Sequence, residues 1–235
     1  MKNKKNTIGT IGIMSGTLEV PVPFLISYAQ MIQFNNEYLC NPGEIIHLAY
    51  THASYHSLAR NSLVKQRRGD WTLMLDTDHS FEPHICSRMV HIMYKYDVEV
   101  LVGMYMYKST PHTPVLYTWN ENKDGFSGIA AWDETATIFE IASSGGGCLL
   151  VKNSVYDRLE AEYTDTGPFS EIPPYSEDHS FFMRLSKIGV QPYCAPSIQY
   201  NHLITKEVTL DDYYHDKDNY DILTSDNRIN VGGYA

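Results

Sequence analysis

The stretch Trp71-Thr-Leu-Met-Leu-Asp-Thr-Asp78 is a short apolar run that leads directly into two carboxylates. Such a run predicts a buried strand, which places Asp76 and Asp78 at its carboxyl end. Residues two apart in a strand point to the same face, and neighbouring carboxylates repel each other unless a cation neutralises them. Oxygen ligands of this kind suit Mg²⁺ or Mn²⁺. The stretch therefore predicts a metal site; the alternative is that the two acids only cap the following helix.

The sequence on both sides of this stretch alternates between apolar strands and helices with periodic apolar residues. Repeated β-α units predict an α/β fold with a parallel, doubly wound sheet and ligands at the carboxyl ends of its strands. The expected strands are 7–14, 43–50, 71–78 and 98–105, and the expected helices are 24–35, 54–68 and 82–94.

The pattern changes in the second half of the chain. Residues 106–142 contain the prolines and glycines typical of turns and short strands. The segment from residue 205 is polar, acidic and rich in tyrosine, which indicates a mobile cover or a disordered end. Further regular elements are expected at 147–151 (a strand) and at 155–163 and 177–188 (two helices).

Composition excludes several classes of protein. The chain has 235 residues, 43% hydrophobic and 20% charged, as in soluble globular proteins. No apolar run approaches the roughly 20 residues of a membrane span, and the first residues lack the apolar core and cleavage site of a signal peptide. The four cysteines are far apart, so we expect reduced thiols and a cytoplasmic protein rather than a zinc or disulfide framework.

The net charge of −10 argues against a protein that clamps nucleic acid by its phosphates. The charge is unevenly distributed: residues 1–120 hold 10 basic and 9 acidic residues, whereas residues 121–235 hold 8 and 19. An anionic ligand is therefore better tolerated by the first half than by the second.

A second acidic pair, Glu177 and Asp178, opens the predicted helix at 177–188. Acids in a first helical turn are favoured by the helix dipole, which is the structural explanation for the pair. A carboxylate at a helix start that faces a cleft can also accept a proton from an attacking hydroxyl. Asp178 and Glu177 are therefore candidate general bases.

Three smaller features complete the set. Glycines 145–147 precede a predicted strand, and they allow either a close approach of backbone to a ligand or a positive φ, unless they form only a flexible turn. Their spacing matches neither the GxGxxG nor the P-loop pattern. His202 follows a further predicted strand, and Arg60 lies on the helix at 54–68. Arg60 can reach a diphosphate or form a surface salt bridge.

In this order, the features resemble the GT-A glycosyltransferases, and among them glycosyltransferase family 2. The run Glu177-Asp178 to Gly189 looks like that family's helix, ED-x-x-(F/L)-x-x-R-(L/A)-x-x-x-G. The resemblance covers roughly residues 7–204. Its other parts are Asp76-Thr77-Asp78, Gly145-Gly146-Gly147 before a strand, and Pro196 followed by His202.

The resemblance implies a GT-A fold, with a mostly parallel central sheet flanked by helices and a small additional antiparallel sheet. It implies one domain over residues 1–204, with a nucleotide-binding half (1–105) and an acceptor half (106–204), followed by an acidic tail or flap at 205–235. The implied activity transfers a sugar from a nucleotide-diphospho-sugar, a UDP-sugar foremost, to an acceptor hydroxyl with Mn²⁺ or Mg²⁺.

The resemblance also implies roles for individual residues. Asp178, or else Glu177, would be the base in an inverting displacement; in a retaining enzyme, Asp178 would only orient the acceptor. Asp78, Asp76 and His202 would hold the metal. The donor would contact Met14, Ser15, Gly16, Arg60, Asn61, Asp76, Thr77, Gly145, Gly146 and Gly147.

The first loop, residues 15–23, departs from the usual family-2 opening, and a small chain of this kind looks more like stand-alone viral or phage transferases. The acceptor is then a saccharide, a protein or a modified nucleic-acid base, and the location is the cytoplasm, that of the host if the protein is viral. Two other functions remain open. One is a nucleotidyltransferase, disfavoured because Ser15-Gly16-Thr17 contains no basic residue; the other is a non-catalytic protein that binds nucleotide sugars.

Overall fold

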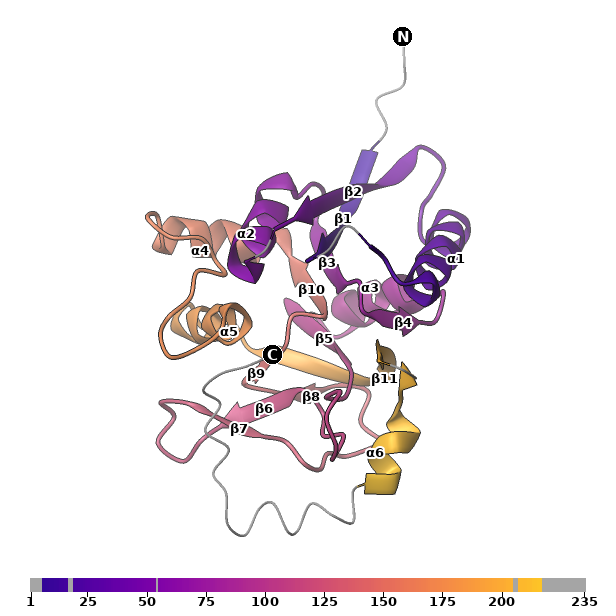
Figure 1. Cartoon of the computed structure of the whole chain (residues 1–235). Helices are drawn as coiled ribbons and strands as arrows, with labels where there is room; N and C mark the ends of the chain where they lie inside the picture. Colours follow the sequence, from indigo (N-terminus) through magenta and orange to yellow (C-terminus); the bar gives the residue numbers. More distant parts are fainter. Residues whose placement is uncertain (1–5, 17–18, 54, 205–206, 217–235) are drawn as a thin grey trace.

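The predicted strand at residues 71–78 forms β3, an inner strand of the large sheet in the computed structural model (Figure 1). The structure describes residues 6–16, 19–53, 55–204 and 207–216. Strands and helices alternate over the first half of the chain, as predicted, apart from one additional short strand, β4, directly after β3. The elements are β1 (Asn6–Ser15), α1 (Val22–Tyr38), β2 (Glu44–His52), α2 (His56–Gln66), β3 (Trp71–Asp76), β4 (His79–Phe81), α3 (Ile85–Lys95) and β5 (Val100–Met104).

The second half begins with short strands and then returns to longer elements, again as expected. Its elements are β6 (Leu116–Trp119), β7 (Phe126–Gly128), β8 (Phe139–Glu140), β9 (Ser143–Ser144), β10 (Cys148–Lys152), α4 (Asn153–Glu162), α5 (Glu177–Lys187), β11 (Pro192–Leu203), β12 (Glu207–Val208) and α6 (Leu210–Asp216).

The large sheet has the strand order β12-β11-β5-β10-β3-β1-β2, with β4 and β8 paired to β11 outside this path. β1 pairs in parallel with β2 and β3, and β11 pairs in parallel with β5. β10 lies between β3 and β5 and runs antiparallel to both. Five strands of the path (β2, β1, β3, β5 and β11) therefore share one direction, which confirms the mostly parallel α/β sheet.

The position of one strand does not follow from the sequence pattern. The alternation over residues 7–105 predicts a parallel sheet but does not place the later strand at 147–151, and β10 separates β5 from β3. Residues 148–151 of β10 are apolar and fully buried, so they fit between two inner strands. An apolar run indicates that a strand is buried, but it does not specify the strand's neighbours.

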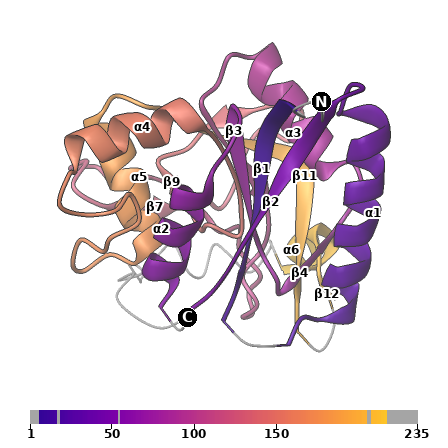
Figure 2. The same ribbon diagram turned by 90° about the horizontal axis from the view of Figure 1, so that it is seen from above.

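Helices cover both faces of the sheet and bury a separate core on each side (Figure 2). One core forms beneath α1 and α3 and includes Phe24, Met31 and Met89. The other forms beneath α2, α4 and α5 and includes Leu63 and Phe181. Burial of these apolar side chains is the main force that holds the helices against the sheet.

A small second sheet lies beyond the edge of the large one, with the order β7-β6-β9 and antiparallel pairing throughout. This confirms the small additional antiparallel sheet. Among the described residues, no helix combines the length and the apolar character that crossing a membrane requires.

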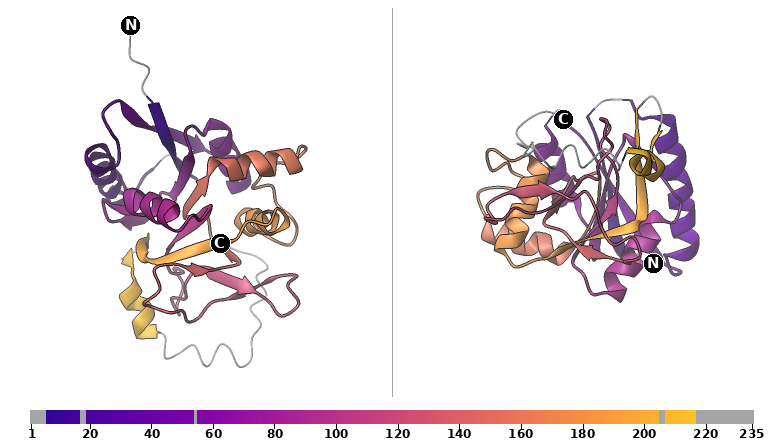
Figure 3. Two further views of the ribbon diagram at one scale, coloured as in Figure 1. Left: turned by 180° about the vertical axis from the view of Figure 1, so that it is seen from behind. Right: turned by 90° about the horizontal axis from the view of Figure 1, so that it is seen from below.

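The first part of the predicted tail packs on the domain (Figure 3). β12 pairs with β11, and the hydroxyl of Tyr213 on α6 donates a hydrogen bond of 2.8 Å to the carbonyl oxygen of Ala130. Residues 207–216 therefore form regular elements rather than a disordered end, and a mobile cover stays a prediction. The rest of the tail, 217–235, lies outside the described residues, and a domain limit at 204 stays a prediction.

Candidate functional site

The two acids that end the 71–78 stretch have different partners. Asp76 is the last residue of β3 and contacts the guanidinium of Arg60. Asp78 lies in the turn before β4 and contacts His79 and Lys108. Neither acid caps α3, whose first turn has no side-chain capping bond. The stretch thus supplies one carboxylate to each of two separate clusters.

The first cluster, here called the imidazole cluster, consists of Asp78, His79 and His202. Antiparallel pairing of β4 with β11 sets the two histidines opposite each other, with ring centroids 4.0 Å apart. Oδ1 of Asp78 lies 2.8 Å from Nδ1 of His79, and Oδ2 lies 3.9 Å from Nε2 of His202. One ligand atom from each residue falls within 4.8 Å of the others. The structure therefore brings together two predicted metal ligands, Asp78 and His202.

Backbone contact orients His202 for ligation. Its Nδ1 lies 2.5 Å from the carbonyl oxygen of Met106. A carbonyl can only accept a hydrogen bond, so Nδ1 carries the proton and the lone pair of Nε2 faces Asp78. Burial, followed by the nearby His79 ring, lowers the pKa of His202 to about 4. The imidazole is therefore neutral at pH 7, which is the form that binds metal ions.

His79 is the member of the cluster that the sequence did not predict. It is 1% exposed, and neither ring nitrogen forms an aligned hydrogen bond within the described part of the chain, although Nδ1 lies close to Asp78. Buried polar atoms without partners are unfavourable, and a cation beside Asp78 would satisfy one of them. The only sequence signal is that His79 directly follows Asp78, which does not distinguish a ligand from a core histidine.

Lys108 completes the surroundings of Asp78. Its Nζ lies 2.5 Å from Oδ2 of Asp78, and the lysine side chain is 41% exposed. Burial acts to raise the pKa of Asp78, but contacts with His79 and Lys108 outweigh it and hold the pKa well below its usual range. Asp78 is therefore ionised at neutral pH.

The second cluster, here called the arginine hub, is centred on the buried guanidinium of Arg60, which is 2% exposed. Nη2 lies 3.2 Å from both oxygens of Asp76, Nε donates to Glu177 over 3.3 Å, and Nη1 donates to the carbonyl of Gly146 over 2.9 Å. Burial acts against the charge, but the carboxylates of Asp76, Glu177 and Asp178 more than offset it and raise the pKa of Arg60. Arg60 thus does not form a surface salt bridge, and its guanidinium is not exposed to a nucleotide-sugar donor.

The glycine segment packs directly against these side chains. A Cβ on Gly146 would lie 2.4 Å from Cζ of Arg60, and one on Gly145 would lie 2.1 Å from the hydroxyl of Tyr105. The amide of Gly147 donates to that same hydroxyl over 3.3 Å. All three glycines are buried, and none has a positive φ. Close side-chain approach, rather than backbone conformation, favours glycine at positions 145 and 146.

Glu177, the first of the two acids at the start of α5, belongs to the arginine hub. It is 7% exposed, and besides Arg60 its Oε1 lies 3.7 Å from Nδ1 of His56. Burial, together with the charge of Asp178, raises the pKa of Glu177, while Arg60 and His56 act in the opposite direction. The Glu177 carboxylate is therefore held by protein groups.

Asp178, the second acid, is half-buried, and its carboxylate accepts hydrogen bonds from the amide of His179 (2.8 Å) and the hydroxyl of Ser176. Three tyrosine hydroxyls also lie within the electrostatic reach of its charge. Burial is the main cause of the raised pKa of each hydroxyl, and Asp178 adds to it; the tyrosines are Tyr105, Tyr107 and Tyr117.

Most of the other predicted donor contacts are covered by protein. Met14 and Ser15 are buried at the end of β1, Gly16 just beyond them is exposed, and Thr77 is half-buried in the turn after β3. Asn61 accepts a 2.9 Å hydrogen bond from the amide of Phe169 and so holds the loop before α5. Of these residues, Met14 and Ser15 are buried, Asn61 and Thr77 are partly exposed, and Gly16 is exposed.

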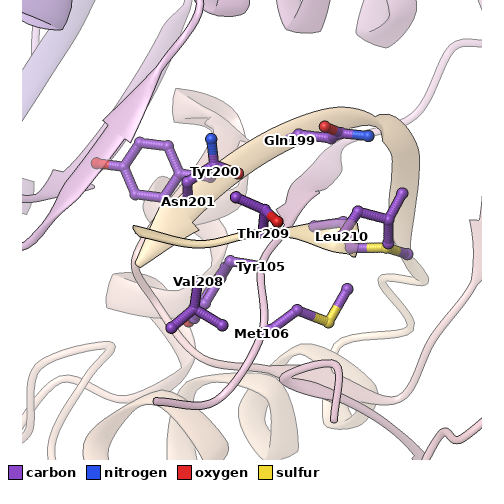
Figure 4. Close-up of a pocket in the computed structure, with 9 residues that line it drawn as sticks. Tyr105, Met106, Gln199, Tyr200, Asn201, Val208, Thr209 and Leu210 are labelled. Atoms are coloured by element: carbon purple, nitrogen blue, oxygen red, sulfur yellow. The ribbon is translucent and has the colours of Figure 1, made fainter. Parts of the chain in front are cut away.

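A cavity between the end of β5, β11 and the start of α6 lies beside Tyr105 and Tyr200 (Figure 4). Its volume is about 10 Å³, which is room for one water molecule. It is therefore far too small for a nucleotide. Its lining residues are Met104, Tyr105, Met106, Gln199, Tyr200, Asn201, Val208, Thr209 and Leu210.

Comparison with known proteins identifies the fold by structure and not by sequence. No protein-family model matches the chain, and neither does any curated protein sequence. A197 from STIV, a viral protein, is similar with a TM-score of 0.56 and 16% identity, over 88% of this chain and 91% of that one.

Two structures with bound nucleotides are also similar. GalNAc-T7 with UDP, GalNAc and Mn²⁺ gives a TM-score of 0.59 at 9% identity, over 85% of this chain and 43% of that one. UDP-glucose pyrophosphorylase complexed with UDP-glucose gives 0.50 at 8% identity, over 92% of this chain and 99% of that one. The protein therefore has the GT-A-like fold of enzymes that handle nucleotide sugars.

Proposed function

We propose that the protein is a metal-dependent glycosyltransferase that transfers a sugar from a UDP-sugar to an acceptor hydroxyl with inversion. The observation that carries the proposal is the imidazole cluster, in which a carboxylate and two imidazoles converge beyond the carboxyl end of β3. Tyr105 packs against this cluster, with its ring 5.0 and 5.1 Å from those of His79 and His202. Burial is the main cause of the raised pKa of its hydroxyl, and the charges of Asp76 and Asp178 add to it.

The imidazole cluster would hold the divalent cation. Mixed carboxylate and imidazole ligands suit Mn²⁺ better than Mg²⁺, which prefers oxygen ligands. A bound cation would offset the negative charge of a leaving nucleoside diphosphate as a Lewis acid. The chain contributes an ionised Asp78 and a neutral His202 whose orientation is fixed by Met106. The similar GalNAc-T7 structure contains UDP and Mn²⁺, which supports these two ligands as the first to test.

Asp178 would accept the proton of the attacking hydroxyl. A general base needs a carboxylate that an acceptor can reach. Glu177 is buried and paired with Arg60, whereas Asp178 is half-buried and forms hydrogen bonds only with its own helix start among the described residues. This difference supports Asp178 over Glu177 as the base.

The experiment combines thermal unfolding with product analysis over a set of UDP-sugars and Mn²⁺. We expect UDP with Mn²⁺ to raise the Tm by mass action, and the cognate donor to release UDP. Asp178→Asn should retain the Tm shift and lose UDP release, and Asp165→Asn, a change at an exposed acid, should behave as wild type. The proposal is overturned if no nucleoside diphosphate with Mn²⁺ changes the Tm.

Nucleotidyl transfer is the second candidate, because the UDP-glucose pyrophosphorylase structure is similar over 92% of this chain. The two activities differ in the released product, since sugar transfer releases UDP and nucleotidyl transfer releases pyrophosphate. A non-catalytic sugar-binding protein would bind UDP-sugars and release neither product.

We place this activity in a reducing compartment, the cytoplasm of the cell or of a host, because all four cysteines are unpaired in the structure. The acceptor class is proposed to be a saccharide, a protein or a modified nucleic-acid base. Incubation of a radiolabelled donor with each class of acceptor distinguishes them.

A further inference from the structure

The side-chain ammonium of Lys108 contacts the carboxylate of Asp78, the residue proposed to bind the metal ion. The ammonium lies 2.5 Å from Oδ2, the same oxygen that the Nε2 lone pair of His202 faces at 3.9 Å. The other oxygen, Oδ1, faces His79 at 2.8 Å. Asp78 is therefore surrounded by two imidazoles and one ammonium, and the ammonium contacts the same carboxylate oxygen that faces His202.

An ammonium and a divalent cation are competitors at this oxygen. An ammonium has three donors and no lone pair, so Lys108 cannot become a metal ligand. Two cations next to one carboxylate oxygen repel each other strongly where water is partly excluded. A cation bound by Asp78 and His202 therefore requires that the ammonium move away.

The structure allows that movement. Lys108 is 41% exposed, and it lies in the connection between β5 and β6 rather than inside a strand or helix. Its long stem can swing without loss of core contacts. Asp78, in contrast, is fixed between the end of β3 and the start of β4, so the carboxylate stays in place while its partner changes.

We infer that Lys108 is a displaceable cation: it neutralises Asp78 in the metal-free protein, and it binds the nucleotide diphosphate once a metal ion takes its place. The inference rests on the proposed function, since it assigns a diphosphate to the same edge of the sheet. Lysine suits this task because it binds phosphate as a mobile point charge. A salt bridge to Asp78 with no further role would weaken metal binding but would not strengthen nucleotide binding.

Calorimetry with two probes tests the inference: Mn²⁺ alone, and UDP in the presence of saturating Mn²⁺. Lys108→Met should bind Mn²⁺ about three- to tenfold more tightly, because a competing ion pair is removed. The same variant should bind UDP about tenfold more weakly, because a charge-assisted contact is lost. Lys108→Arg keeps the charge and should bind UDP nearly as wild type does.

Lys152→Met is the matched control. Its ammonium also pairs with one carboxylate, Asp97 at 2.9 Å, but Lys152 is paired with Trp71 at the opposite end of β3. Lys152→Met should leave the affinities for Mn²⁺ and for UDP unchanged. If Lys108→Met binds Mn²⁺ no more tightly than wild type, or binds UDP as tightly as wild type, the role of Lys108 is overturned and the proposed function is not. A wild-type protein that binds no Mn²⁺ or no UDP overturns the proposed function as well.

Discussion

The arginine hub and the imidazole cluster receive one acid each from the same stretch, yet they have opposite character. In the hub, Arg60 is 2% exposed, and all its nitrogens lie against carboxylates or a carbonyl. In the cluster, His79 is equally buried, but its nitrogens form no aligned hydrogen bond within the described residues, and Asp78 is paired with a movable lysine. Complete internal pairing favours a structural role for the hub, whereas the imidazole cluster is the proposed ligand site.

The largest effect should follow from breaking the hub. Arg60→Met leaves the buried carboxylate of Glu177 without the guanidinium that compensates its charge. Loss of one partner of a buried ion pair costs about 3–5 kcal/mol of unfolding free energy. Urea denaturation measures this cost. Arg158→Met is the control, because Arg158 pairs with Glu99 on the surface, where such a pair contributes at most about 1 kcal/mol. Equal losses in the two variants would remove the distinction between the hub and a surface pair.

The second prediction separates the two acids. Asp78→Asn should abolish the rise in Tm caused by Mn²⁺, which at a hundredfold excess over Kd corresponds to about 2.7 kcal/mol. Asp76→Asn should lower the Tm without metal, because it weakens the hub, but should keep the metal-induced rise. Thermal unfolding with and without Mn²⁺ measures both. A metal response that depends equally on Asp76 and Asp78 would contradict the assignment of Asp76 to the hub.

The third prediction concerns the packing between the glycine segment and the hub. Gly146→Ala places a methyl group 2.4 Å from Cζ of Arg60, so the guanidinium must move. We expect a loss of about 1–3 kcal/mol, as for other overpacked core sites, measured by urea denaturation. Gly128→Ala is the control, because its Cβ would meet open space. The close-approach explanation fails if both substitutions have the same effect.

The smallest effect concerns pH. His179 follows Asp178 on α5, its Nδ1 lies 2.7 Å from the hydroxyl of Ser143, and burial lowers its pKa below the ordinary value of about 6.5. As the pH falls below that value, the unfolded chain takes up a proton first, so the folded state loses stability.

Unfolding free energies at pH 7.5 and 5.5 test this directly. The wild type should lose more stability between these two values than His179→Gln, whose side chain does not titrate. Equal losses would show that His179 does not contribute to the acid sensitivity of the folded protein.

Sequence reasoning predicted the fold class and most of the important side chains. Short apolar runs and helical periodicity marked the strands and helices to within a few residues. The motifs selected Asp76, Asp78, Glu177, Asp178 and His202 because they occur together, in the order of the GT-A pattern, although each acid alone also has a structural explanation. What the motifs could not provide was the division of these residues into two clusters, since spacing along a strand does not specify partners from distant elements.

The sequence by itself determined the alternating α/β pattern, because burial and backbone periodicity act locally. Only the tertiary structure decided that β10 enters between β3 and β5, and that β4 pairs with β11 so that His79 faces His202. It also decided that Arg60 is buried against Asp76 and Glu177. These contacts join residues that are far apart in the sequence, by 16 positions for residues 60 and 76 and by 123 for residues 79 and 202. The energies that select such contacts come from packing and desolvation in the assembled core, which local sequence does not contain.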